Sequence, residues 1–217
     1  MTQKGNTSEL IEKKYLGLAD DNINSKNFKK ALKYFEKILK INPKNIKALI
    51  GKGFIMCQIY EKNDVAIKCF KKAIQIDEEN LKAWQNLGAV FFKIGKQNEA
   101  IKCFRYALKI EPENKLLLYN IGLLLEDVGK NREALKCYEK VLSIDPDFSP
   151  ALNNKGGILF KMKRYDEAII SLEKAIPKLS KTSLIWENIG KVLLKMGKTD
   201  EAEYYLKQAN KIRKKIL

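Results

Sequence analysis

Residues 81–114 of the 217-residue chain read LKAWQNLGAVFFKIGKQNEAIKCFRYALKIEPEN, and this segment has the clearest helical pattern in the sequence. Its first half places large apolar residues at helical spacing, among them Leu87 and Phe91. Gly95 interrupts the pattern, and helical spacing then resumes as far as Pro112, which ends the second helix. The stretch therefore predicts a helix, a tight turn and a second helix.

The same pattern returns along the chain at a shift of 34 residues. Four residue types keep this step: Cys69, Cys103 and Cys137; Asn86, Asn120, Asn154 and Asn188; Gly88, Gly122, Gly156 and Gly190; Ala66, Ala100, Ala134, Ala168 and Ala202. The recurring glycine and alanine have no bulk to hold two helices apart, so the helices of one pair can approach closely. Because one such pair cannot bury its own apolar face, neighbouring pairs must stack.

Residues 81–114 match the tetratricopeptide repeat pattern place for place, and the whole chain resembles a tetratricopeptide repeat (TPR) protein. The resemblance implies an all-α fold, a right-handed α-solenoid (superhelix) of stacked helix-turn-helix repeats. It also implies a scaffold for protein binding, and not an enzyme. The predicted repeats are residues 12–45, 46–80, 81–114, 115–148, 149–182 and 183–216, which form one continuous domain (12–216) after a lead, residues 1–11, that is partly disordered or starts the first helix.

The composition argues against the common kinds of catalytic and metal site. The chain has no histidine, which excludes Ser-His and Cys-His nucleophile pairs, imidazole acid-base catalysis and His metal ligands. Three of the four cysteines lie one repeat apart, too far for a disulfide, and no C-x-x-C spacing occurs in the sequence. Gly197, Lys198 and Thr199 imitate the end of a phosphate-binding loop, but Val192 stands where that loop needs glycine. We therefore expect no catalytic residue, no metal, no nucleotide and no cofactor.

The sequence also predicts the compartment. Residues 1–10 have no apolar stretch of the kind that a signal peptide contains. Charges interrupt every apolar stretch far short of the roughly 20 residues that a membrane span needs. We expect a cytoplasmic protein without a membrane partner.

The resemblance places the first helix of each repeat on the concave face of the solenoid, where a ligand would bind. The strongest positional signal there is an asparagine at the sixth place of four successive repeats: Asn86, Asn120, Asn154 and Asn188. A carboxamide offers a donor and an acceptor, which match the N–H and C=O of a peptide backbone. The row is similar to the asparagine ladder of O-linked N-acetylglucosamine transferase repeats, which grips peptide main chain. The alternative interpretation, that asparagine is simply common at this place of the repeat, stays open.

Apolar and aromatic residues occupy other places of the expected concave face. The candidates are Phe54, Phe92, Tyr119, Leu123 and Phe160. Such residues on a groove wall suit an apolar side chain or an amphipathic segment of a partner. Together with the asparagines they predict a peptide-binding groove of mixed character. The alternative for each of them is partial burial between helices.

One ligand class known for the family is the C-terminus of heat-shock chaperones, which a two-carboxylate clamp holds. The clamp needs Lys and Asn at the fifth and ninth places of one repeat, where this chain has Leu16 and Asp20. It also needs Asn at the sixth place of the next repeat, where this chain has Gly51. The sequence therefore argues against a chaperone C-terminus as the ligand.

The basic character of the chain favours a second function class. The formal net charge is +16, spread over five of the six repeats, and many lysines fall on second helices: Lys29, Lys30, Lys33, Lys37 and Lys40. A solvated surface explains such a distribution, and nucleic-acid (RNA) binding through distributed Lys and Arg is the alternative. A third hypothesis is a recognition subunit of a separate enzyme.

The last repeat ends without the proline that closes the first, third and fourth repeats, and it reads Lys211, Ile212, Arg213, Lys214 and Lys215 instead. Repeat arrays generally need a polar element at each end. Three arrangements could shield the exposed surface of the last repeat: the Lys-rich last turn itself, self-association of two chains, or a partner.

Overall fold

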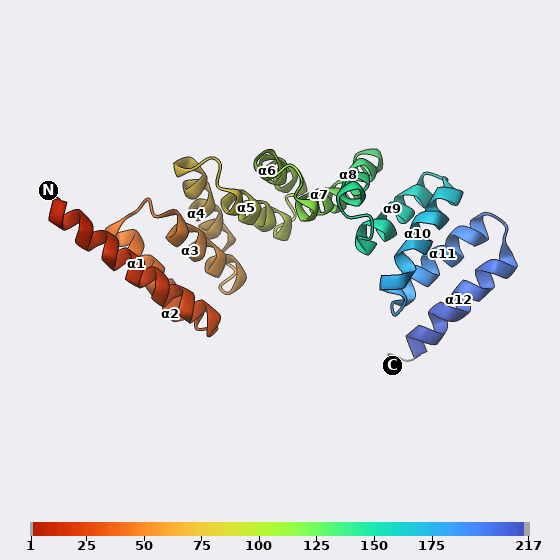
Figure 1. The fold of residues 1–217 in the computed structure, drawn as a ribbon, viewed down its shortest axis with the longest axis horizontal. Helices are drawn as coiled ribbons and strands as arrows, with labels where there is room; N and C mark the ends of the chain where they lie inside the picture. Colours follow the sequence, from red (N-terminus) through yellow and green to blue (C-terminus); the bar gives the residue numbers. More distant parts are fainter. Residues whose placement is uncertain (1, 215–217) are drawn as a thin grey trace. The chain divides into compact units, whose positions relative to one another are not determined.

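The computed structural model describes residues 2–214, and within them the chain folds into twelve α-helices (Figure 1). They are α1 (Thr2–Asn24), α2 (Phe28–Ile41), α3 (Ile46–Gln58), α4 (Asn63–Ile76), α5 (Leu81–Lys93), α6 (Gln97–Ile110), α7 (Lys115–Asp127), α8 (Asn131–Ile144), α9 (Ser149–Lys161), α10 (Tyr165–Leu179), α11 (Ser183–Lys195) and α12 (Thr199–Lys214). The predicted all-α solenoid of stacked helical pairs is confirmed.

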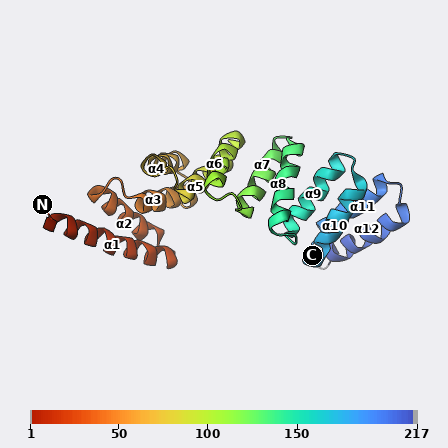
Figure 2. The same cartoon turned by 45° about the horizontal axis from the view of Figure 1, so that its top comes forward.

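The chain divides into two compact units, Met1–Pro112 and Glu113–Leu217. In the first unit α1 packs with α2, α3 with α4 and α5 with α6 (Figures 1 and 2). Within this unit α2 also packs against α3, and α4 packs against α5. The second unit repeats this order from α7 to α12. Each unit is therefore a stack of three pairs in sequence order.

The two ends of the chain differ from the interior. Helix α1 starts at Thr2, so the predicted lead, residues 1–11, lies within this helix except for Met1. Met1 and residues 215–216 of the predicted last repeat lie outside the described residues. Helix α12 buries only Ala202 and Ala209 among its described residues, and its other side chains are mainly polar. This helix therefore presents a polar surface at the end of the second unit.

Asparagine side chains start three of the first helices. Asn45, Asn80 and Asn114 each accept a hydrogen bond from the backbone N–H three residues later. Such an N-cap is worth about 1 kcal/mol, because it satisfies one of the free N–H groups of the first turn. These caps stabilise the first turns of α3, α5 and α7.

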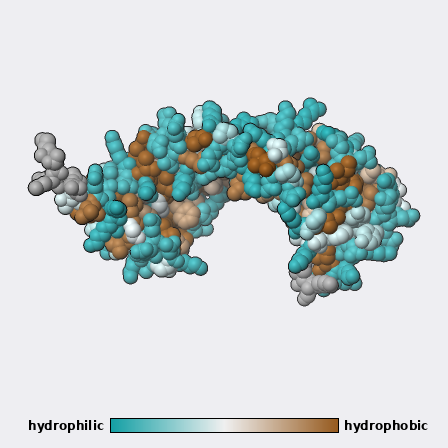
Figure 3. All heavy atoms as spheres, in the orientation of Figure 1, coloured by the Kyte–Doolittle hydropathy of each residue, from teal (hydrophilic) through white to brown (hydrophobic). Residues whose placement is uncertain are grey.

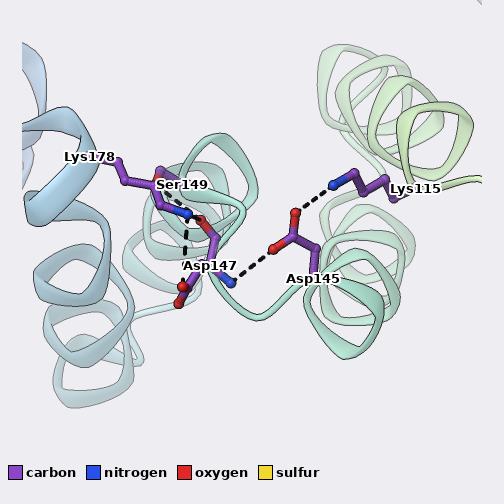
Figure 4. A network of polar contacts seen from close by, with 5 residues as sticks. All are labelled: Lys115, Asp145, Asp147, Ser149 and Lys178. Atoms are coloured by element: carbon purple, nitrogen blue, oxygen red, sulfur yellow. Dashed lines mark hydrogen bonds and ion pairs between the residues drawn. The ribbon is translucent and has the colours of Figure 1, made fainter.

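The link before α9 lacks such a cap and is held by charged residues instead (Figure 4). The Lys115 ammonium at the start of α7 lies 2.5 Å from the Asp145 carboxylate, whose pKa this hydrogen bond lowers. The Asp147 backbone N–H donates to the same carboxylate at 3.3 Å. The Lys178 ammonium on α10 donates to the Asp147 carbonyl at 3.0 Å. Contacts from α7 and α10 therefore position the segment between α8 and α9.

Close approach inside each pair depends on a glycine of the first helix. In the third pair, a Cβ built on Gly88 would lie only 2.6 Å from the Phe104 ring. Equivalent glycines face a large side chain of their own second helix in four other pairs: Gly53 with Phe70, Gly122 with Tyr138, Gly156 with Leu172, and Gly190 with Leu206. The small residue is needed because the partner side chain fills its space.

The first pair solves the same packing problem differently. Its first helix carries Ala19, fully buried, where the later pairs have glycine. The Phe35 ring instead reaches the next first helix, where a Cβ on Gly51 would lie 2.3 Å from its tip. Phe35 therefore explains why Gly51 occupies the place at which the later repeats have asparagine.

The surface in view is mainly hydrophilic, with apolar side chains in small patches (Figure 3). This fits a chain in which 31% of the residues are charged. Among residues 2–214, the search for a helix with the length and apolar content of a membrane span found none.

Two neighbouring glycines in α9 test whether glycine is required where a large side chain of the second helix fills the space of a Cβ; we call this requirement the packing rule. A Cβ on Gly156 would lie 2.5 Å from Leu172 Cγ, so Gly156→Ala is expected to lower the free energy of unfolding by about 1–3 kcal/mol. Nothing lies within 4 Å of a Cβ on Gly157, so Gly157→Ala is expected to raise it by roughly 0.5–1 kcal/mol through helix propensity. Urea unfolding of the two variants and the wild type measures both effects. Shifts of the same sign would contradict the packing rule.

Candidate functional site

The predicted site residues lie on the first helices, which form one face in each unit. We call this the first-helix face; it is built by α1, α3 and α5 in the first unit and by α7, α9 and α11 in the second. Several large apolar side chains are exposed there, with Phe92 at 55% and Leu123 at 36% of their full accessibility. Phe160 is half-buried and packs with Tyr165, the two ring centroids lying 5.8 Å apart. The predicted apolar residues therefore differ in how far a ligand can reach them.

Tyr119 is one of the less accessible candidates. Its ring lies between Tyr138 and Phe148, with centroid distances of 5.8 and 5.4 Å. Burial raises the pKa of its hydroxyl, and a hydrogen bond from Asn154 acts in the opposite direction. Tyr119 therefore forms part of the wall of the first-helix face, with its polar end inside a hydrogen-bond network.

Asn154 lies at the centre of that network. Its Nδ2 donates to the Tyr119 hydroxyl at 3.2 Å and to the Tyr138 hydroxyl at 3.4 Å. Its Oδ1 accepts a hydrogen bond from Asn153 Nδ2 at 3.2 Å. Both ends of this carboxamide are therefore engaged within the protein, and a peptide would have to replace one of these partners.

Asn188 and Asn153 extend the network to the last pair. Asn188 Nδ2 donates to Asn153 Oδ1 at 3.1 Å, which links α11 to α9. The sequence analysis missed Asn153, because the fifth place of the repeat carries no recurring residue type. Its position next to a predicted asparagine is the only signal that pointed to it.

At its other end the network reaches a charged pair. The Tyr138 hydroxyl donates to Glu126 Oε2 at 3.3 Å, and Lys161 Nζ lies 2.8 Å from Glu126 Oε1. Tyr138 is fully buried, and this burial raises its pKa. The network thus runs from α11 through α9 and α8 to α7. It ties the three pairs of the second unit together and stiffens the surface that they share.

The two remaining asparagines of the predicted ladder have different surroundings. Asn120 is exposed and makes no side-chain hydrogen bond to another described residue. Asn86 Nδ2 donates to the Lys82 carbonyl of its own helix at 2.7 Å. Asn86 also lies beside Phe54, which is 40% exposed, in a hollow of about 410 Å³. Four residues that look equivalent in the sequence therefore have three kinds of environment.

Three of the cysteines lie on second helices, and Cys57 lies on α3. Cys57, Cys69 and Cys103 are buried, Cys137 is half-buried, and none of the four forms a disulfide. Desolvation raises the pKa of Cys103 to about 11, so this thiol stays protonated near neutral pH. No group of three or more metal-ligating side chains occurs among the described residues.

The buried phenol of Tyr138 gives the network a measurable pH dependence. Its raised pKa means that the folded protein favours the neutral form more than the unfolded chain does. Stability from this group is fully present below pH about 10 and falls as the pH rises towards the folded-state pKa. Between pH about 8 and about 11, the loss of stability should be smaller for Tyr138→Phe than for the wild type.

Urea unfolding across this pH range measures the slopes, with Tyr204→Phe, at a side chain that is 57% exposed, as the control. The control is expected to keep the wild-type slope. Equal slopes for Tyr138→Phe and the wild type would refute a contribution of this phenol.

Comparisons with known proteins agree with this architecture. Family models described as tetratricopeptide repeat match residues 13–45, 81–114, 116–148 and 147–215, and one described as TPR repeat matches residues 61–95. No curated protein matches the sequence.

Three solved structures with the same fold each match most of this chain. The crystal structure of MamA protein is 28% identical, with a TM-score of 0.71, over 79% of this chain and 93% of that one. The pilF structure from Pseudomonas aeruginosa is 18% identical, with a TM-score of 0.74, over 92% and 90%. YrrB, described as a TPR protein with an unusual peptide-binding site, is 23% identical, with a TM-score of 0.69, over 79% and 88%.

Proposed function

The chain belongs to the tetratricopeptide repeat family, whose repeats form non-enzymatic scaffolds for protein interactions, and we propose that it holds a segment of a partner protein on its first-helix face. The observation that carries the proposal is a group of exposed apolar side chains on four of the first helices, α3 and α5 in the first unit and α7 and α11 in the second. It comprises Phe54, Phe92, Leu116, Leu123, Leu184 and Leu194. Exposed apolar side chains that gather on one face are typical of a binding surface.

Polar groups beside these side chains suit a peptide backbone. The exposed Asn120 carboxamide has a free donor and a free acceptor among the described residues. Asn86 lines the hollow beside Phe54, and its Nδ2 is held by its own helix. A partner segment would thus find apolar contacts and backbone hydrogen bonds on one face.

The network through Asn154 supports this function indirectly. It fixes Tyr119 and the neighbouring first helices before a ligand arrives, so less order has to be imposed on binding. We assign Asn154 and Asn188 a positioning role and Asn120 a contact role. The likeness to YrrB concerns the fold, which that protein uses to present a peptide-binding site. The four cysteines form no disulfide, which fits a reducing compartment, and we propose that the protein acts in the cytoplasm.

Replacing both kinds of contact group tests the proposal. The double variant Asn120→Ala, Leu123→Ala removes one exposed carboxamide and one apolar side chain from α7. It is expected to weaken partner capture about ten-fold, because a hydrogen bond and partial apolar burial are lost. Affinity capture from an extract of the source organism, quantified by mass spectrometry, measures the effect. Circular dichroism should show unchanged helix content.

Asn210→Ala on α12 is the matched control, because Asn210 is an exposed asparagine on a second helix. It should leave capture unchanged. If the double variant captures the same proteins as the wild type, the first-helix face does not bind the partner. Recovery of an enzyme in the wild-type capture would support a recognition subunit within the same proposal.

A second candidate function is binding of a polyanion such as RNA to the second helices of the first unit. These helices expose many cations: Lys29, Lys30, Lys33, Lys40, Lys68, Lys71, Lys72, Lys102, Arg105 and Lys109. Tyr106, 48% exposed, stacks on Trp84 at a centroid distance of 4.6 Å, and Lys109 lies above its ring. Basic residues around an exposed aromatic ring favour single-stranded nucleic acid.

Gel shift with a single-stranded RNA at two salt concentrations tests this candidate. Electrostatic binding should fall by orders of magnitude between about 50 and 200 mM salt. Lys68→Glu with Lys71→Glu should weaken it further. Absence of a shift at the lower salt concentration would exclude the candidate.

A further inference from the structure

The hollow of about 410 Å³ on the first-helix face of the first unit has an apolar interior. Its walls come from Leu16 and Ile23 on α1 and from Ile50 and Phe54 on α3, and its floor includes the Phe35 ring. Leu16 and Ile23 also pack against the buried cluster that contains Phe35. The wall that α1 provides is therefore part of the packed core and exists before any ligand binds.

Two neighbouring substitutions in the repeat pattern create this hollow. Ala19 replaces the glycine that would receive Phe35 within the first pair, so the Phe35 ring lies against Gly51. Gly51 in turn replaces the asparagine that the later repeats carry at the sixth place. The Phe35 ring and the side-chain-free Gly51 therefore form the surface at the place where the later repeats have an asparagine carboxamide.

The rim of the hollow is charged in a defined way. Lys47 and Lys82 line it from the first turns of α3 and α5 and are exposed. The N-terminal ends of these two helices add partial positive charge at the same place. Asp20 lies on the rim towards the later part of α1. The lysine side of the rim is therefore suited to a carboxylate.

We propose that this hollow seats one large apolar side chain of an internal segment of a partner protein, with a neighbouring Asp or Glu of that segment held by Lys47 and Lys82. This inference rests on the proposed function and names the ligand class for the first unit. The carboxylate belongs to a side chain and not to a chain terminus. The reason is that Leu16 and Asp20 stand where a terminal carboxylate would need cationic and amide groups.

Selection from a library of random dodecapeptides, displayed internally so that no C-terminus is free, tests the proposal. The selected sequences are expected to share one Phe, Leu, Ile, Met or Trp with Asp or Glu within two positions. Fluorescence anisotropy with a selected peptide, acetylated and amidated, then measures affinity. Replacing its apolar residue with alanine should weaken binding about ten-fold or more, because that side chain is buried in the complex.

Variants of the protein locate the peptide. Phe54→Glu changes a wall residue that is 40% exposed, so the fold should tolerate it, and binding should be lost. Lys47→Glu with Lys82→Glu should weaken binding about three- to ten-fold, with a smaller effect in high salt. Lys136→Glu with Lys140→Glu, two exposed lysines on α8 of the second unit, makes the same change of net charge outside the hollow and should leave binding unchanged.

Four outcomes would overturn the inference. One is a selection that enriches no peptide, or enriches peptides without the apolar and acidic pair. Another is equal binding to the wild type and Phe54→Glu. A third is equal weakening by the two double lysine variants, which would indicate nonspecific charge attraction. The fourth is self-association of the protein that Phe54→Glu abolishes, which would assign the hollow to a second copy of the chain.

These outcomes are separate from failure of the proposed function. If capture of the cellular partner depends on Asn120 and Leu123 but not on Phe54, the scaffold function stands and the hollow has no role in it. If the selected peptides bind the hollow while neither set of variants alters cellular capture, the hollow binds this ligand class and the proposed partner site is wrong.

Discussion

The close contact between a glycine of each first helix and a large side chain of its second helix is the interaction on which the structure depends. In five pairs the side chain fills the space that a Cβ would need, as Phe104 does at Gly88. This brings the two backbones together and leaves the outer faces of the pair free to stack. The first-helix face depends on this contact, because the first helices share a face only when the closely packed pairs stack.

The first pair shows how one departure from this contact changes a surface. With Ala19 in place of glycine, Phe35 packs against the neighbouring first helix and requires Gly51 there. An asparagine place becomes a glycine, and an apolar hollow opens with lysines at its rim. In the second unit, Tyr138 occupies the place in its repeat that Phe35 occupies in the first repeat. The Tyr138 hydroxyl accepts a hydrogen bond from Asn154, so a polar contact forms there. The same structural place thus yields a pocket in one unit and a polar network in the other.

The polar network also explains why a row of equal residues need not be a row of equal binding groups. A buried donor or acceptor costs free energy unless it is paired, so Tyr138 requires partners such as Asn154 and Glu126. Asn120 is exposed to solvent, so water can satisfy its polar groups and no protein partner is required. That the row binds peptide backbone stays a prediction. One asparagine is available for contact, and others hold the surface in place.

The sequence by itself determined the all-α class, the stacking of pairs and the absence of histidine chemistry, because helical spacing, turn residues and composition are local properties. It also predicted which helices carry the candidate residues, since the step of 34 residues repeats their places. Only the tertiary structure decided which candidates are accessible. Tyr119, Tyr138, Asn153 and Asn154 meet from three helices, and Phe35 reaches a helix of the next pair. Such contacts depend on side chains brought together from separate helices, and no periodicity along one chain records them.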